Sequence, residues 1–324
     1  MTDPSPTLSI KNRQRSGATW RATKDRWAKR FFYGLVSLPI LLVLVIFSSL
    51  WVRSWPILTT QSLGNLLGGM SWFPSRGIFG FFPFIMGTFY VTGLAMILAV
   101  PVCLLTAIYL SEYASPRLRE MVKPMLDLMA AIPSVVYGVW GVIAIVPLVQ
   151  TINPILNQSL GFLPFIKTHN PTGFSILAGS LVLAVMVAPF MISITYEVLR
   201  TVPDGYREAS LAVGATRWET VKYAVLPKTT GGIMAGVVFG ASRALGETMA
   251  VMMVVGNVVQ VPVSIFDPAY PLPALIANNY GEMLSVPLYD AALMLAALLL
   301  LLIVMAFNLL STLLLYRFIG RGAQ

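Results

Sequence analysis

Long runs of apolar residues constrain the fold of this 324-residue chain more than any other feature of its sequence. Six such runs occur, at residues 31–52, 85–110, 128–149, 172–196, 233–256 and 291–316. Each run reaches the roughly 20 residues that an α-helix needs to cross about 30 Å of hydrocarbon. Because no water bonds to backbone groups inside a bilayer, each run is predicted to be helical. We therefore predict an all-α polytopic membrane protein with six transmembrane helices.

The composition excludes a soluble domain and a nucleic-acid-binding protein. Hydrophobic residues make up 57% of the chain and charged residues only 11%, which is unlike the composition of soluble domains. The net charge of +9 comes from Lys and Arg residues in the gaps between apolar runs, not from one basic surface. The single cysteine, Cys103, excludes an internal disulfide and is expected to be a small buried packing residue.

The distribution of Lys and Arg predicts which side of the membrane each loop occupies. Eighteen of these residues lie before the first run, after the second, after the fourth or after the sixth, whereas the other loops carry only Arg53, Arg76 and Lys167. The positive-inside rule places the first group in the cytoplasm, together with both termini. We therefore predict a basic cytoplasmic N-terminal tail at residues 1–30 and a six-span transmembrane domain at residues 31–324.

A polar segment between the fourth and fifth runs carries its own helix signals. Asp204 is predicted to cap the start of a short helix, and Gly214 is placed to end that helix in the left-handed conformation. Thr216 and Glu219 have the spacing of a capping box that opens a second short helix. Pro227 is predicted to stop or bend the chain after it. The segment is thus predicted to be two short helices joined at a glycine corner outside the bilayer.

The fifth run carries features that constrain both packing and charge. Arg243 is the only Lys or Arg inside a predicted span, near its middle, where insertion costs roughly 2.5–3.5 kcal/mol. Glu247 is the expected partner one turn later, although Arg before Glu is the weaker order on a helix. The two residues are either a packing ion pair or part of a pathway for a charged substrate. A stripe of small residues that favours close helix packing lies beside them, at Gly232, Gly236 and Gly240.

The sequence contains no recognisable catalytic or metal-binding motif. It has no Gly-Lys pair, so it cannot form a phosphate-binding loop for ATP, and it has no His-Glu-x-x-His sequence. The only histidine, His169, has no second ligand near it in the sequence and is expected to be solvated. No metal, cofactor or enzymatic activity is predicted. Among the remaining classes, the missing motif disfavours a membrane enzyme, whereas Arg243 and the Gly214 corner disfavour a structural scaffold and favour a transport subunit.

The polar segment resembles the cytoplasmic coupling loop of permease subunits in ABC importers. That loop has Glu-Ala-Ala, a glycine four residues later and then Leu-Pro, and the matching residues here are Glu208, Ala209, Ser210, Gly214, Leu226 and Pro227. Ser210 stands where the family has a second alanine. The resemblance implies that the loop at residues 200–229 docks on a separate ATPase, with Glu208, Ala209 and Gly214 at the contact.

Three further stretches, at residues 87–114, 132–138 and 243–248, resemble the phosphate permeases of this family. The resemblance covers about residues 80–316 and implies the MetI-like fold of type I importers. It also implies a bacterial inner-membrane subunit that forms half of a phosphate pathway, with Arg243 and Glu247 in that pathway. The implied partners are a second permease subunit, a dimer of ATPases and an external phosphate-binding protein. Sulfate or molybdate remains an alternative substrate, and the second permease is either a copy of this chain or a different one.

Overall fold

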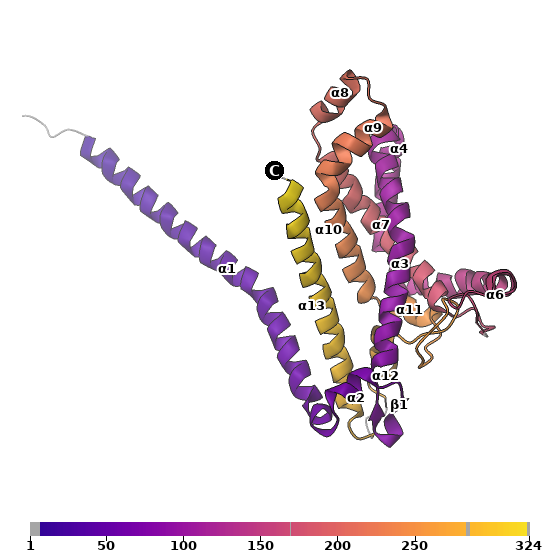
Figure 1. The fold of residues 1–324 in the computed structure, drawn as a ribbon. Helices are drawn as coiled ribbons and strands as arrows, with labels where there is room; N and C mark the ends of the chain where they lie inside the picture. Colours follow the sequence, from indigo (N-terminus) through magenta and orange to yellow (C-terminus); the bar gives the residue numbers. More distant parts are fainter. Residues whose placement is uncertain (1–6, 169, 283–285, 323–324) are drawn as a thin grey trace, which may run out of the picture. The chain divides into compact units, whose positions relative to one another are not determined.

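The computed structural model describes residues 7–168, 170–282 and 286–322, which are mostly helical (Figure 1). The first elements are α1 (Thr7–Thr60), α2 (Leu63–Gly68), β1 (Trp72–Phe73), the 3₁₀ turn η1 (Pro74–Arg76), β2 (Ile78–Phe79), α3 (Phe82–Ile108), the π-helical turn η2 (Tyr109–Tyr113) and α4 (Pro116–Ala131). The antiparallel pairing of β1 with β2 is the only sheet in the described residues. The prediction of an all-α architecture is confirmed apart from these two short strands.

The remaining elements are again helices, some of them interrupted by wider turns. They are α5 (Ser134–Trp140), the π-turn η3 (Gly141–Ile145), α6 (Val146–Leu160), α7 (Ile176–Arg200), α8 (Asp204–Ala212), α9 (Arg217–Thr220), the π-turn η4 (Val221–Val225), α10 (Leu226–Leu245), α11 (Met249–Val254), α12 (Leu272–Asn279) and α13 (Tyr289–Gly322). Met1–Val52 and Arg53–Gln324 form separate compact units. In the first unit, α1 is continuous from Thr7, so much of the basic tail is helical.

Six helices in the described part of the chain are long and apolar enough to cross a membrane, as predicted. Their bounds are Lys24–Thr60, Phe82–Tyr113, Ser134–Ser159, Ile176–Arg200, Arg217–Leu245 and Tyr289–Tyr316. The third begins later than predicted because Ile132 is extended before Pro133, as residues before proline prefer, and this break separates it from α4. The fifth ends at Leu245, and the predicted continuous helix over residues 233–256 is wrong.

Helices α3 and α7 pack along each other and form the centre of the second unit. The contact face of α3 has small residues at a four-residue spacing, and all four are nearly inaccessible: Ala95, Ala99, Cys103 and Ala107. The Cys103 thiol donates a weak hydrogen bond to the Ala188 carbonyl of α7. Cys103 is therefore a buried packing residue, as predicted.

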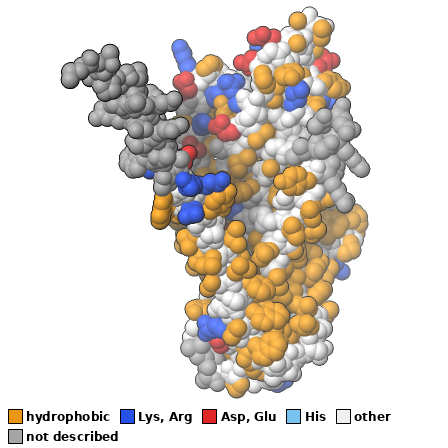
Figure 2. Space-filling view, turned by 90° about the vertical axis from the view of Figure 1, so that its left-hand side faces the viewer, with side chains coloured by type: hydrophobic (Ala, Val, Ile, Leu, Met, Phe, Trp, Pro, Cys, Tyr) orange, Lys and Arg blue, Asp and Glu red, His pale blue; other side chains and the backbone are white. Residues whose placement is uncertain are grey.

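The two ends of the second unit differ in structure and in charge. Helices α8 and α9 lie at one end, and α2, the β1–β2 pair and the start of α13 lie at the other (Figure 1). In Figure 2, charged side chains gather at the end that carries α8, and the spans of the second unit expose many large apolar side chains. This distribution suits a bundle whose middle faces lipid and whose α8 end faces water.

Candidate functional site

Helix α8 opens the polar segment between α7 and α10, and residues 203–216 are called the α8 corner below. The N-cap residue is Pro203, and the helix begins at Asp204. No side chain makes a capping hydrogen bond at this end. The prediction that Asp204 caps the helix is therefore wrong. Its carboxylate instead accepts a hydrogen bond from Arg207 Nη1 at 3.2 Å. A negative charge at this position still stabilises the helix, because the N-terminus of a helix dipole is positive.

Gly214 ends α8 in the left-handed conformation, as predicted, with φ +87°. The Gly214 N–H donates to the Leu211 carbonyl at 3.0 Å, and the Ala215 N–H donates to the Ser210 carbonyl at 3.3 Å. These two bonds are those of a Schellman motif, which satisfies the last carbonyls of a helix. A Cβ added at Gly214 would have no atom within 4 Å. The glycine is thus required here for its backbone conformation and not for space within this chain.

The predicted capping box opens α9. The Glu219 N–H donates to Thr216 Oγ1 at 3.3 Å, and the Thr216 N–H donates to Glu219 Oε2 at 2.7 Å. Pro227 does not stop the helix that follows, because α9, the π-turn η4 and α10 form one continuous helical run. The wide turn η4 ends at Val225, two residues before Pro227, and a turn of this kind accommodates a proline, which has no N–H to donate.

The predicted contact residues Glu208, Ala209 and Gly214 all lie exposed on the α8 corner. No residue of α8 is buried. Large apolar side chains are exposed beside them, with Val213 at 84% and Trp218 at 50%. A protruding polar segment with a patch of apolar side chains is typical of a protein-docking surface.

Arg207 and Glu112 form a partly buried ion pair that the sequence reasoning missed as a site. Glu112 lies in η2 at the end of α3, and Arg207 lies on α8, so the pair joins two segments 95 residues apart. The hydrogen bonds that Arg207 donates to the Glu112 carboxylate raise the pKa of the Arg207 guanidinium. The only sequence signal was a carboxylate directly after an uncharged apolar run, which indicates that a cationic partner lies nearby.

Arg243 lies in the last turn of α10 and not in the middle of a continuous helix. Its guanidinium carbon is 5.4 Å from the ring centroid of Phe190, on α7. Phe190 in turn stacks on Phe239, one turn before Arg243 on α10, at 4.9 Å between centroids and an interplanar angle of 29°. The positive charge therefore rests on an aromatic face, an arrangement that stabilises a cation away from bulk water.

Glu247 follows the end of α10 and does not pair with Arg243. The four ion pairs between described residues do not include these two side chains. Glu247 Oε1 accepts a hydrogen bond from the Ala250 N–H at 3.3 Å, at the start of α11. The residue lines a small cavity to which α3 contributes Thr88 and Thr92. The predicted pairing of Arg243 with Glu247 one helical turn later is wrong, because residues 246–248 interrupt the helix.

The glycine stripe of α10 lies against α7. An added Cβ would lie 2.5 Å from Val198 Cγ1 at Gly232, 3.0 Å from Ile194 Cγ2 at Gly236 and 2.7 Å from Met191 Cγ at Gly240. Real Cβ atoms essentially never show contacts under 3.0 Å, so a side chain at Gly232 or Gly240 would force the facing side chains or the helices to shift, and one at Gly236 would make a tight contact. The stripe thus fixes the side of α10 that faces α7, and with it the direction of Arg243 toward Phe190.

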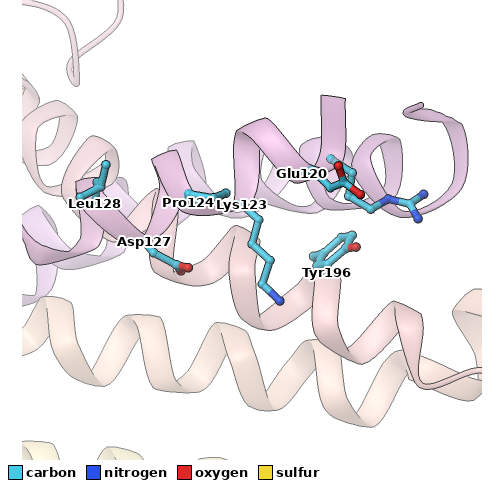
Figure 3. Close-up of a pocket in the computed structure, with 7 residues that line it drawn as sticks. Glu120, Lys123, Pro124, Asp127, Leu128 and Tyr196 are labelled. Atoms are coloured by element: carbon cyan, nitrogen blue, oxygen red, sulfur yellow. The ribbon is translucent and has the colours of Figure 1, made fainter. Parts of the chain in front are cut away.

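A second charged region lies between α4 and α7, at the same end as the α8 corner. Figure 3 shows Lys123 reaching from α4 toward α7 with Tyr196 beside it. The Lys123 ammonium pairs with Glu197, and the hydrogen bond that it donates to that carboxylate raises the pKa of Lys123. Both side chains of this pair are half exposed. Surface pairs of this kind contribute little stability, so we assign no function to it.

His169 lies outside the described residues, so the structure says nothing about its solvation. In the described part of the chain, no three His, Cys, Asp or Glu side chains are grouped so that they could hold a metal ion.

Comparison with known proteins bears on the fold and the family. Residues 100–321 match the family described as "Binding-protein-dependent transport system inner membrane component". A crystal structure of a bacterial ABC transporter involved in the import of the acidic polysaccharide alginate has a chain of similar fold. The TM-score is 0.59 with 17% identity, and the match covers 93% of this chain and 99% of that one. The expected importer-permease fold is confirmed.

Two curated relatives are similar over most of their length. The phosphate transport system permease protein PstC of Mesorhizobium japonicum is 35% identical over 287 residues, which cover 84% of this chain and 87% of that protein. The protein of the same name from Xylella fastidiosa is 37% identical over 306 residues, which cover 92% and 93%. Similarity of this extent, together with the family match and the six spans, shows that the chain belongs to the inner-membrane components of binding-protein-dependent transport systems.

Proposed function

We propose that this chain is a permease subunit of an ATP-driven importer for inorganic phosphate and forms half of its translocation pathway. The observation that carries the proposal is the similarity to permeases named for phosphate transport over more than four-fifths of the chain. The chain has no phosphate-binding loop of its own, so ATP hydrolysis is assigned to a separate dimer of ATPases. A second permease of similar fold and an external phosphate-binding protein complete the proposed complex.

The exposed part of the α8 corner around Glu208 to Gly214 is the proposed docking site for the ATPase. It protrudes at the end that carries most Lys and Arg, which the positive-inside rule assigns to the cytoplasm together with both termini. The exposed residues Glu208, Ala209 and Gly214 supply the contact. Gly214 presents bare backbone there, so an ATPase surface can approach closely without meeting a side chain.

Arg243 is the proposed cation of the phosphate pathway. Its neighbour in the structure is the Phe190 ring, and no described carboxylate lies within 4 Å of it. An aromatic face stabilises the charge without occupying the N–H donors. Those donors form a planar fork that fits the oxygens of an oxyanion. Glu247 is also assigned to the proposed pathway, because it lines the small cavity that α3 borders.

Uptake of labelled phosphate, sulfate and molybdate tests this function. A strain that lacks the chain is compared with the same strain carrying the wild-type chain, at equal ATPase and binding-protein levels. We expect the wild-type chain to restore phosphate uptake and to leave sulfate and molybdate uptake unchanged. Restored sulfate or molybdate uptake without phosphate uptake would contradict the proposed substrate, and restoration of none would contradict the proposed transport function.

A further inference from the structure

Arg207 attaches the α8 corner to the end of α3. Its Nε donates to Glu112 Oε2 at 3.0 Å, and its Nη2 donates to Glu112 Oε1 at 2.9 Å. The two parallel bonds form a guanidinium–carboxylate fork, which fixes direction as well as distance. The Arg207 and Glu112 side chains are only 14% and 10% exposed, although the rest of α8 lies at the surface.

The same guanidinium also holds the end of α7. Arg207 Nη2 donates to the Leu199 carbonyl at 2.9 Å, and Nη1 donates to the Val202 carbonyl at 2.6 Å. Carbonyls at a helix C-terminus have no partner within the helix, so a side chain that binds them is held firmly in place. Arg207 therefore connects α8 to α3 and α7 together, the two helices at the centre of the bundle.

Both of these helices reach the residues of the proposed pathway. Helix α3 contributes Thr88 and Thr92 to the small cavity that Glu247 lines. Helix α7 contributes Phe190, whose ring lies under Arg243. A displacement of α8 that is transmitted through Arg207 thus reaches the neighbours of both charged residues.

Helix α10 is attached to the α8 corner by a different route. Helix α8 packs against α9 and η4, which continue into α10. Thr220 Oγ1 donates to Ser210 Oγ at 3.0 Å across this contact. Movement of the corner can therefore displace α10 without Arg207. Helix α7 is joined to α8 by the short segment 201–203 as well as by Arg207, whereas the attachment of α3 to α8 is the ion pair with Glu112.

We propose that Glu112 and Arg207 are a positioning pair that makes α3 and α7 follow the α8 corner when the ATPase moves it. The pair thereby couples ATP hydrolysis to rearrangement around Arg243 and Glu247. This inference rests on the proposed importer function. A lysine at position 207 would keep the charge beside Glu112 but would lack the fork that binds several oxygens at once.

The variant Arg207→Lys tests the pair in the complete complex, purified with its partner subunits and reconstituted in liposomes. Complex yield, basal ATP hydrolysis and phosphate imported per ATP hydrolysed are measured together. We expect normal yield and basal hydrolysis, with phosphate per ATP lower by about tenfold, within the range usual for coupling between two sites. A smaller fall is expected for Glu112→Gln, which keeps the shape of the carboxylate and loses its charge.

The matched control is Lys123→Met, which removes the exposed pair with Glu197 at the same end of the bundle. Its phosphate import per ATP is expected to equal that of the wild type. Normal import per ATP by Arg207→Lys would overturn the proposal. So would a loss of import that only follows a loss of complex yield, because that result indicates support of the fold alone.

A distance measurement tests the pair without any transported substrate. Spin labels are attached at Gly205→Cys on α8 and at Leu105→Cys on α3, both exposed positions. In complexes with native Arg207, the label distance is expected to stay the same with and without bound nucleotide. In Arg207→Lys it is expected to change when nucleotide binds. A change with native Arg207, or none in Arg207→Lys, would overturn the inference, whereas failed phosphate import by the wild-type complex would contradict only the proposed function.

Discussion

Arg243 and Glu247 are four residues apart in the sequence, yet they have different neighbours in the fold. Arg243 lies over Phe190 of α7, and Glu247 borders α3 and accepts a bond from the start of α11. Their charges are therefore stabilised separately, by an aromatic ring and by a helix N-terminus. A substitution of one should leave the environment of the other largely intact.

Arg243→Gln is expected to abolish phosphate uptake while the complex still assembles. Glutamine cannot supply positive charge, and Arg243→Lys should also be impaired because a point charge lacks the planar fork. Glu247→Gln is expected to reduce uptake less. Complex yield and uptake are measured for both single variants and for the double variant.

A packing ion pair would give the opposite pattern. Each single variant would then fail to assemble, and the double variant would partly recover, as interacting residues do in a double-mutant cycle. Normal uptake by an assembled Arg243→Gln complex would rule out a function of Arg243 in the pathway.

Phe190→Leu tests the aromatic support of Arg243. A cation–π contact is worth roughly 0.5–2 kcal/mol, so a several-fold fall in uptake is expected at unchanged complex yield. Phe190→Tyr keeps the ring face and is expected to retain uptake. Phe89→Leu, at an exposed aromatic residue of α3 far from Arg243 in the sequence, serves as the control. Equal uptake by Phe190→Leu and wild type would show that the ring does not position the arginine.

At the scale of single elements, the α8 corner is stabilised by hydrogen bonds between residues close in sequence and by one long-range ion pair. The Schellman motif at Gly214 and the capping box of Thr216 and Glu219 are short-range features, so their residue types and spacing predict them from the sequence. The Glu112–Arg207 pair joins residues far apart in the chain, and no local pattern selects one arginine among several in the same loop. For this reason the sequence predicted the shape of the corner but not its attachment.

The fifth span shows that hydropathy alone does not predict where a membrane helix ends. The residues of α11 are apolar, so residues 233–256 read as one continuous run although the helix breaks after Leu245. Hydropathy measures burial in lipid and does not distinguish a helix from an apolar segment that turns. The error displaced Arg243 from the last turn of α10 to the middle of a span and produced a false pairing with Glu247.

Gly214→Ala and Gly214→Val separate backbone strain from contact with the ATPase. A residue with a Cβ in this conformation costs about 1–2 kcal/mol, and neither side chain meets another atom of the chain. Both variants should still insert, and Val is expected to lose more stability than Ala because a β-branched residue adopts a positive φ less readily. Val is expected to abolish ATP-driven uptake, because its larger side chain meets the docked partner, and Glu208→Gln is expected to weaken ATPase binding.

Gly205→Ala is the matched control for Gly214. Gly205 is exposed, has nothing near its added Cβ and does not have a positive φ, so the substitution should be silent. ATPase co-purification and phosphate uptake are measured for each variant. Normal co-purification and transport by Gly214→Val would contradict the docking function of the corner.

For the whole molecule, the charge asymmetry predicts one orientation in the membrane. Reporter fusions after Lys123, Lys228 and Gln324 are expected to report a cytoplasmic location, and fusions after Thr168 or Ala277 an external one. The assay compares a reporter active only in the cytoplasm with one active only outside. An external signal after Lys228 would place the α8 corner away from any ATPase and end the docking proposal.

The number of spans followed from run length and apolarity alone, because the bilayer fixes both. Which side of each helix faces its neighbours could not be predicted, since this depends on contacts between residues far apart in the sequence.

The π-turn η4, directly before α10, affects which side of α10 faces its neighbours. One extra residue in a helix turns everything beyond it by about 100° around the axis. The wide turn at Val221–Val225 takes up such an extra residue without that rotation, so the glycine row faces α7 and Arg243 reaches Phe190. Loss of one residue inside the turn leaves those faces in register, whereas loss of one residue between Leu226 and Gly232 rotates them away.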